Sequence, residues 1–99
     1  MELYFLDSSF DRLEVDRAYS HGLPAAVVTL YRKRLQLLRA ARDVADLAAM
    51  RCLRLGPAGA HPNRRFSVHL NRSYRLMVEL RQQTNPSALW IVDIREGQT

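Results

Sequence analysis

Cysteine is nearly absent from this sequence, and long apolar runs are missing from it. The single Cys52 has no partner for a disulfide within the chain, and no cluster of Cys and His offers the four ligands of a structural zinc site. No apolar stretch approaches the roughly 20 residues that span a bilayer. The first residues also lack the basic segment and apolar core of a signal peptide. We therefore expect a cytoplasmic protein with no membrane contact, no metal and no other cofactor.

Acidic residues are absent from one quarter of the chain. Residues 51–76 hold six arginines and neither Asp nor Glu, so this segment carries a charge of +6. Residues 1–50 hold seven basic and seven acidic groups and are neutral overall. Such a basic block is the electrostatic footprint of a phosphate-binding protein, and a merely solvated basic surface is the alternative interpretation.

The length and composition are those of one folded unit. The chain has 99 residues, of which 47% are hydrophobic and 25% charged, values typical of a folded rather than a disordered protein. It is long enough to bury one hydrophobic core and too short to add a separate cofactor domain. We expect residues 1–99 to form a single domain.

The first half of the chain predicts one strand followed by helices. Residues 2–6 are aromatic and apolar, as in a strand. Ser8 stands three residues before an acid, which is capping-box spacing and predicts the start of a short helix. After a Gly-Pro break at residues 21–24, apolar residues recur every three or four positions, which predicts an amphipathic helix from residue 25 to about 42. Residues 43–49 are expected to add a short helical turn or two.

The second half predicts strands. Residues 52–55 can form a strand, and residues 56–63, with two Gly and two Pro, predict a loop. A further turn is expected at residues 82–87. Residues 88–94 form a last strand whose almost continuous apolar character indicates a central position in the sheet.

A hairpin is predicted between these segments. Apolar and polar residues alternate on both sides of the polar turn at residues 71–73. If Leu70 pairs with Tyr74, then His69 lies opposite Arg75, and both side chains project from the sheet face that points away from the core.

This order of elements indicates an α+β fold. We expect two N-terminal helices packed on one face of a small antiparallel sheet with a mixed edge. Because helices of this number can cover only one face, the face that carries His69 and Arg75 stays open.

At this point the succession of residues resembles the HigB branch of the RelE/ParE toxin superfamily. The similarity runs along nearly the whole chain and is carried by residues 53–55, 66–71, 74–76 and 91–93. The resemblance implies a RelE-like microbial RNase-type fold. It also implies a toxin that is encoded beside its antitoxin and cleaves mRNA in the ribosomal A site. The partners implied are the ribosome, mRNA and a HigA-like helix-turn-helix antitoxin, with DNA reached only through that antitoxin.

The resemblance also implies a catalytic site. Asp93, Asn71 and Arg75 match the family pattern, while the family's loop-side His falls on Arg54 and its terminal Tyr-His pair is replaced here by residues 94–95, Ile-Arg.

The catalytic residues are expected to be Arg75, Asp93, His69 and Arg54. The planar fork of Arg75 suits the developing charge on phosphorus, and His69 is the nearest general base or acid. The alternatives are that Arg75 pairs with Glu79 or Asp93, that His69 only packs across strands, and that Asp93 only makes hydrogen bonds.

Further residues around this face are expected to contact RNA. Their role is to hold phosphates without reading sequence, and they are Arg64, Arg65, Arg72, His61, Asn71 and Arg95. Trp90 and Phe66 can stack on bases, but alternation favours core positions for both. Tyr74 is likewise expected in the core.

Two functions remain open at this stage. The first is a ribosome-dependent endoribonuclease that inhibits translation by metal-independent phosphodiester cleavage, favoured by the basic segment with Arg75 and Asp93. The second is a non-catalytic binder of the same fold, either a ParE-like topoisomerase poison or a regulatory relative, favoured by the absent Tyr-His pair.

Overall fold

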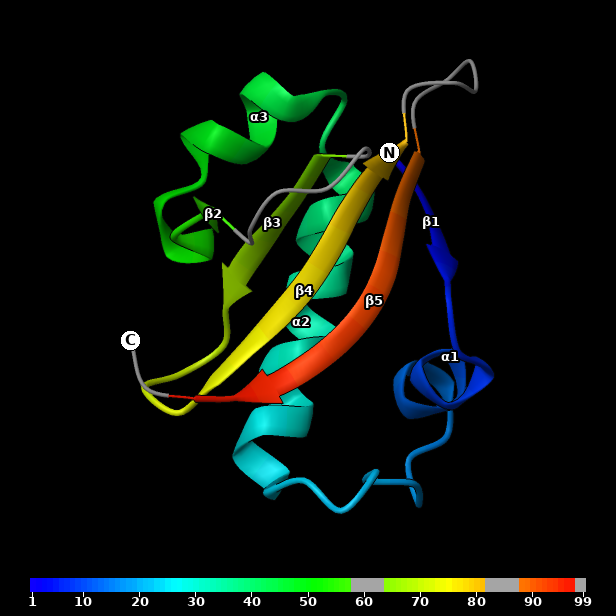
Figure 1. The fold of residues 1–99 in the computed structure, drawn as a ribbon. Coiled ribbons are helices and arrows are strands. Elements are labelled where there is room, and N and C mark those ends of the chain that lie inside the picture. Colours follow the sequence, from blue (N-terminus) through cyan, green and yellow to red (C-terminus); the bar gives the residue numbers. More distant parts are fainter. Residues whose placement is uncertain (58–63, 82–87, 98–99) are drawn as a thin grey trace.

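The computed structural model describes residues 1–57, 64–81 and 88–97 and is built on a five-stranded sheet. The strand order is β1-β5-β4-β3-β2, antiparallel throughout except for β1, which runs parallel to β5 (Figure 1). The strands are β1 (Glu2–Phe5), β2 (Gly56–Pro57), β3 (Arg64–His69), β4 (Tyr74–Arg81) and β5 (Ala88–Glu96). The expected central position of the last strand is confirmed, because β5 pairs with β1 on one side and β4 on the other.

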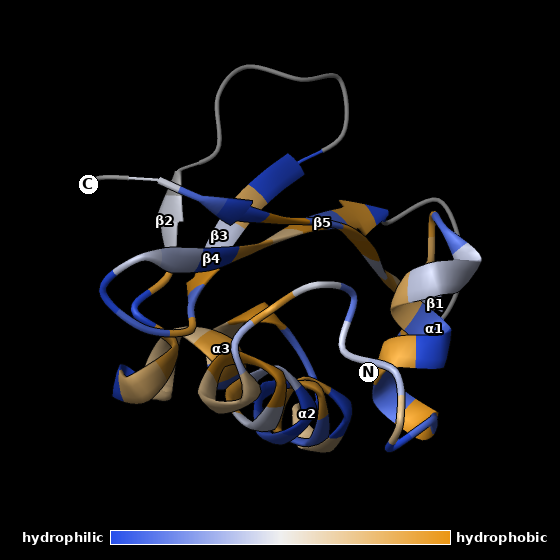
Figure 2. Cartoon of the chain, turned by 90° about the horizontal axis from the view of Figure 1, so that it is seen from below, coloured by the Kyte–Doolittle hydropathy of each residue, from blue (hydrophilic) through white to orange (hydrophobic). Residues whose placement is uncertain are grey.

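The helices lie together on one face of the sheet. They are α1 (Ser8–Val15), α2 (Ala25–Ala40) and the six-residue α3 (Val44–Ala49). Figure 2, a view along the layers, places the sheet above α2 and α3, with α1 at the side next to β1. The α+β class and the one-sided layering are therefore confirmed, with α3 as the short helical addition expected at residues 43–49. The sheet is mixed because of its parallel edge strand.

The helix starts depend on aspartates. Asp7, rather than the expected Ser8, caps α1, and its carboxylate accepts a hydrogen bond of 2.9 Å from the backbone N–H of Ser9. Asp43 caps α3 in the same way and accepts from the N–H of Asp46 at 2.9 Å. Asp and Ser are equally good caps, so spacing alone placed the first helix start one residue late.

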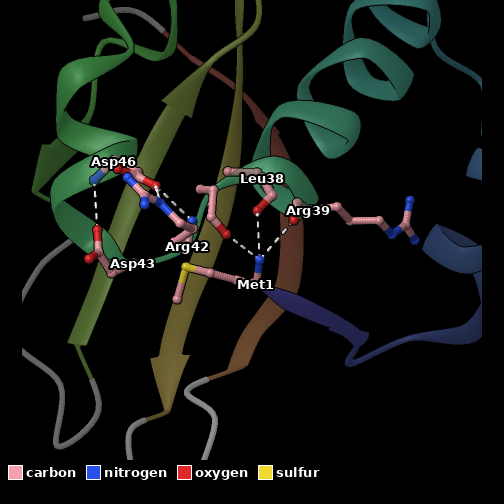
Figure 3. Close-up of polar contacts among 7 residues, drawn as sticks. Met1, Leu38, Arg39, Arg42, Asp43 and Asp46 are labelled. Atoms are coloured by element: carbon pink, nitrogen blue, oxygen red, sulfur yellow. Dashed lines mark hydrogen bonds and ion pairs between the residues drawn. The ribbon is translucent and has the colours of Figure 1, made fainter.

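The end of α2 is held by the amino group of Met1. This ammonium donates to the carbonyl oxygens of Leu38 and Ala41, and to that of Arg39 at 2.8 Å (Figure 3). A positive group at this end of a helix stabilises the unpaired carbonyls and the negative end of the dipole. The contact also joins the start of β1 to the helix beneath the sheet.

The prediction of a strand at residues 52–55 is wrong. The chain instead forms a 3₁₀ turn, η1 (Arg51–Leu53), in which Leu53 is fully buried, and Arg54 adopts a left-handed conformation with φ 42°. The first two residues of the loop expected at residues 56–63 instead form β2 (Gly56–Pro57) and pair with β3, and residues 58–63 lie outside the described residues. A short apolar run does not distinguish a strand from a helical turn, so tertiary packing of Leu53 decided between them.

The hairpin register is confirmed. His69 pairs with Arg75, and the backbone N–H of Leu70 donates to the carbonyl of Tyr74 at 3.2 Å. Val68 and Leu76, on the opposite face, are fully buried in the core with α2. The turn expected at residues 82–87 lies outside the described residues.

Candidate nucleic-acid interface

The sheet face that the helices leave uncovered holds a pocket at the turn end of the β3–β4 hairpin. Its volume is about 470 Å³, and it is lined by Arg54, His69, Asn71, Arg72 and Arg75. We call this the basic pocket. Three of the four expected catalytic residues and two of the expected RNA-binding residues therefore lie together. No acidic side chain is among these lining residues.

Three different segments bring the basic pocket together. Strand pairing places His69, at the end of β3, directly opposite Arg75, at the start of β4. Arg54 enters from the segment after η1, where its left-handed backbone turns the chain away from the helical turn. Such a conformation is uncommon for a residue with a Cβ and costs of the order of 1 kcal/mol. Arg72 projects from the exposed hairpin turn.

Arg34 is a residue that the sequence analysis missed. It lies on α2, and its Nε donates to the backbone carbonyl of His69 at 3.1 Å, so it anchors the end of β3 from beneath. The only signal in the sequence is that Arg34 falls three residues after Tyr31 and four before Leu38, within the buried stripe of the helix.

The electrostatics of the basic pocket keep His69 neutral. Partial burial lowers the pKa of the His69 imidazole below 6.5, and the positive charges of Arg54, Arg34 and Arg75 lower it further. An imidazole with such a pKa is unprotonated at pH 7 and can accept a proton. The chemical consequence is one neutral base surrounded by fixed cations.

Arg75 is available for a ligand. Neither ion pair considered for it forms, because Glu79 pairs with Arg65 and Arg81, and Asp93 pairs with Arg95. Within the described ranges, no carboxylate lies at ion-pair distance from Arg75. Its guanidinium fork can therefore bind two oxygens of a phosphate.

Two expected site residues, Asp93 and Arg95, are outside the pocket lining, and Asn71 within the lining has a structural role. Asp93 is outside the pocket lining, and its carboxylate accepts from the N–H of Ile94 at 2.8 Å and from Arg95 at 3.4 Å. Arg95 is the cross-strand neighbour of Arg75 on β5 and is exposed. Asn71 builds the hairpin turn, since its Oδ1 accepts from the N–H groups of Ser73 and Tyr74.

At the other end of the same open face lies a row of planar side chains. It consists of Arg65 on β3, Glu79 and Arg81 on β4, Trp90 on β5 and Tyr4 on β1. We call this the planar row. Adjacent strands lie about 4.8 Å apart, so four strands give the row a length of about 14 Å.

One buried carboxylate organises the planar row. Glu79 is 2% exposed, and its two oxygens accept from the Nε atoms of Arg65 and Arg81, each at 2.9 Å. Burial by itself raises the pKa of the Glu79 carboxyl, but the hydrogen bonds from Arg81 and Arg65 outweigh burial and leave that pKa below its usual value. Arg65, expected to hold RNA phosphates, thus has its Nε bonded to a carboxylate that it shares with Arg81.

The prediction that Trp90 lies in the core is wrong. Trp90 is half-buried, its ring stacks on Tyr4 with centroids 5.1 Å apart, and Arg81 lies over it at 4.1 Å. An irregularity in the β4–β5 pairing after Met77 brings Trp90 opposite Glu79, on the open face. The bulge shifts the alternation of β5, which the sequence pattern does not reveal.

The remaining expected residues divide between core and surface. Phe66 is buried, as expected. Tyr74 is half-buried at the margin of the core, and its hydroxyl donates to Glu96 at 3.2 Å. Arg64 is exposed and lies in a separate hollow beside β2. His61 lies outside the described residues.

The described part of the chain contains no group of three His, Cys, Asp or Glu side chains placed to hold a metal ion. Among the helices of those residues, none combines the length and apolar character needed to cross a bilayer. Comparison with known proteins adds no family: no protein-family model matches this chain, and no curated protein matches it.

Proposed function

We propose that this chain is the toxin of a type II toxin–antitoxin pair and acts as a ribosome-dependent, metal-independent mRNA endoribonuclease. The observation that carries the proposal is the basic pocket, in which Arg54, Arg72 and Arg75 line the same cavity as a neutral His69. This composition suits a phosphodiester, since the anion meets fixed cations and the base is unprotonated. The cytoplasm, where ribosomes work, is its proposed location.

The proposed reaction uses the 2′-hydroxyl of RNA as nucleophile. His69 accepts the hydroxyl proton as the 2′-oxygen bonds to the adjacent phosphorus, and the bond from phosphorus to the 5′-oxygen breaks. The products are a 2′,3′-cyclic phosphate and a 5′-hydroxyl. Arg75 binds two non-bridging oxygens and stabilises the charge of the phosphorane, a contribution of about 10²–10³ in rate for one such donor. Arg54 and Arg72 hold the flanking phosphates.

The small number of proton-transfer groups supports ribosome dependence. Among the described residues that line the basic pocket, His69 is the one side chain that is neither a permanent cation nor an amide, and so the one that can exchange a proton. The proton for the leaving 5′-oxygen then comes from the His69 imidazolium or from water, in a geometry that the ribosome imposes on the mRNA. Orientation of that kind is worth several kcal/mol of barrier.

The test compares one mRNA in two states. Purified protein, either untreated or treated with EDTA and then dialysed, is added to the free mRNA and to the same mRNA bound in ribosomes, and cut positions are mapped by primer extension. We expect cleavage only on ribosomes and equal cleavage by the two protein samples. Equal cleavage of free and ribosome-bound mRNA would contradict the ribosome dependence, and inactivity of the EDTA-treated protein alone would contradict the metal-independent chemistry.

A second candidate is a non-catalytic binder of the same fold. It is favoured by Asp93, which lies outside the pocket lining with its carboxylate engaged by Arg95, and by Ile94-Arg95 in place of the Tyr-His pair of HigB-like toxins. A binder that poisons a topoisomerase inhibits growth without mRNA cuts. An assay of DNA supercoiling by gyrase, run beside the cleavage assay, separates the two candidates.

A further inference from the structure

The planar row ends in an aromatic stack at the edge of the sheet. The ring of Trp90 lies between two planar groups, because β5 runs between β1, which carries Tyr4, and β4, which carries Arg81. The Tyr4 and Trp90 rings are 23° from parallel with centroids 5.1 Å apart, and the Arg81 guanidinium carbon is 4.1 Å from the Trp90 centroid. A contact of this kind is a cation–π interaction.

The stack is held in place from both ends. At one end, Glu79 accepts a hydrogen bond from Arg81 at 2.9 Å and so fixes the guanidinium against Trp90. At the other end, the hydroxyl of Tyr4 donates to Glu2 at 2.8 Å, which restrains the ring on the edge strand. A flat, restrained surface needs little ordering when a second flat group binds to it.

The outer end of the stack is exposed. Tyr4 is 43% exposed on β1, an edge strand, although a large aromatic side chain gains most from burial. A shallow hollow of about 490 Å³ follows the same edge and is lined by Met1, Glu2, Leu3, Tyr4 and Arg39. A planar ligand can therefore reach the ring of Tyr4 from solvent.

We propose that Tyr4 and Trp90 form a stacking site for a base of single-stranded RNA, on the same face as the basic pocket. The cations that line the hollow beside Tyr4 are already engaged, Arg39 by Glu14 and the Met1 ammonium by carbonyls of α2, and Glu2 adds a carboxylate. The flat ring of Tyr4 is the group left exposed, so the ligand at this end is the base and not the backbone. Phosphates bind at the other end of the face, where Arg75 forms no ion pair with any carboxylate of the described residues. Along β4 the two ends are separated by four residues from Glu79 to Arg75, about 13 Å.

This inference names a binding subsite for the RNA of the proposed function, and its test does not use cleavage. The probe is a short oligoadenylate with 2′-O-methyl sugars, which lacks the nucleophile. Inorganic polyphosphate of similar charge serves as the comparison probe. Trp90 is the one tryptophan of the chain, so its fluorescence reports on the stack directly. We expect oligoadenylate to quench it and polyphosphate to leave it unchanged.

The decisive variant is Tyr4→Ala. We expect its affinity for oligoadenylate to fall roughly 5- to 100-fold, the range for loss of one stacked base, while its affinity for polyphosphate stays that of the wild type. Tyr4→Phe should retain binding. Leu6→Ala, which removes a side chain 55% exposed just beyond the end of β1, is the matched control and should bind normally. If Tyr4→Ala unfolds, Tyr4→Leu replaces it in the test, because leucine still packs against Trp90 but has no aromatic ring on which a base can stack.

The outcomes separate this inference from the proposed function. Arg75→Ala, which should not cleave RNA, should still show the base-dependent quench. Oligoadenylate binding without quench, or with unchanged affinity in Tyr4→Ala and Tyr4→Leu, overturns the stacking site even if ribosome-dependent cleavage is observed. Quench that depends on Tyr4 supports the site even if no mRNA is cut.

Discussion

The two ends of the open sheet face use arginine in opposite ways. In the planar row, Arg65 and Arg81 share the buried carboxylate of Glu79, so each guanidinium has a counter-charge at 2.9 Å and the three groups together carry +1. In the basic pocket, the lining holds three arginines and no acid. Both ends are built on the same strands, β3 and β4. A carboxylate at one register position of β4 therefore makes the neighbouring arginines structural, and its absence four residues away leaves them available for a ligand.

The contrast has an energetic side. Glu79 with its two arginines satisfies a buried charge, and such a group is costly to break once formed. The arginines of the basic pocket gain no such compensation within the described residues, and their mutual repulsion opposes folding. The pocket also holds the left-handed Arg54. Strain and unbalanced charge of this kind are typical of sites where binding, rather than stability, determines the residues.

The largest effect is expected from Arg75→Ala. Because Arg75 has no carboxylate partner in the described chain, its removal should leave the melting temperature unchanged and lower ribosome-dependent mRNA cleavage by about 10²–10³. Growth inhibition should be lost as well. Arg75→Lys should also lose most of the activity, since an ammonium cannot bind two phosphate oxygens in one plane.

Arg17→Ala is the control for Arg75. It removes the same charge from the exposed connection between α1 and α2, away from the open face, and should remain fully active. Full toxicity of Arg75→Ala at an unchanged melting temperature would show that the active site lies elsewhere. A lowered melting temperature of that variant would instead show that Arg75 stabilises the fold. The arginines at both ends of the open face would then be structural.

Glu79→Gln should show the reverse pattern at the other end. Two half-buried guanidinium groups would lose their counter-charge, at a cost of about 2–3 kcal/mol in the free energy of unfolding, reduced because both retain some contact with water. Thermal or urea unfolding at pH 7 measures this loss, with Glu96→Gln, at an exposed carboxylate, as the control.

The Glu79 prediction has a pH signature. Since the pKa of Glu79 is lowered in the folded state, its contribution is complete above the ordinary carboxyl pKa and is lost as the pH falls through the lowered value. The stability gap between wild type and Glu79→Gln should therefore close in acid. A gap that persists unchanged in acid would contradict the ionic role of Glu79.

The protonation of His69 offers a third test. Its pKa is lowered first by burial and then by arginine charges, so cleavage should persist below pH 6.5 and fall only when the pH passes through the lowered value. Arg54→Ala removes one of those charges and should move this acid limb to higher pH. Titration of the His69 ring signals by NMR, together with the pH–rate profile, measures both shifts.

The same shift has a consequence for stability. Below about pH 6.5 an unfolded His69 binds a proton more readily than the folded one, so the free energy of unfolding should decrease as the pH falls toward the lowered pKa. His69→Gln removes this dependence and serves as the reference. If the acid limb of the pH–rate profile does not move in Arg54→Ala, then Arg54 does not influence the pKa of His69.

The smallest effect is expected in the salt dependence of RNA binding. For single strands, log affinity falls against log salt with a slope of about −0.7 for each phosphate neutralised. Arg72→Ala, at the exposed pocket rim, should make the slope shallower by about 0.7. Arg65→Ala should change it much less, because the guanidinium of Arg65 is already engaged by the carboxylate of Glu79. Equal changes of slope in Arg72→Ala and Arg65→Ala would show that both arginines contact RNA phosphates to the same extent, which contradicts the proposed difference between the basic pocket and the planar row.

Local pattern was sufficient to predict the hairpin and the long helix. Alternation on both sides of a polar turn placed His69 opposite Arg75, and that pairing is observed. The three- and four-residue spacing of apolar side chains predicted α2 within two residues of its end. Both features repeat over many residues, so each position supports the others. The clustering of His69 and Arg75 on an uncovered face followed directly from them.

Features that depend on one residue or on a partner element could not be predicted. The fate of residues 52–55 depends on where Leu53 packs, and the anchoring Arg34 depends on which strand end crosses α2. The position of Trp90 depends on a single irregularity in the pairing of β4 with β5. A shift of one residue moves every later side chain to the opposite face of the sheet. A bulge therefore makes a prediction of core or surface from alternation wrong for the residues beyond it.

The sequence by itself determined the α+β class, the one-sided helical layer and the charge asymmetry, because periodicity and composition are properties of the chain. Only the tertiary structure decided which of the described arginines pair with a carboxylate and which do not. Whether a guanidinium lies within 4 Å of a carboxylate depends on strand register and on the strands that meet, as at Glu79. Electrostatic interactions act over such distances between residues far apart in the chain, and a linear pattern contains no record of them.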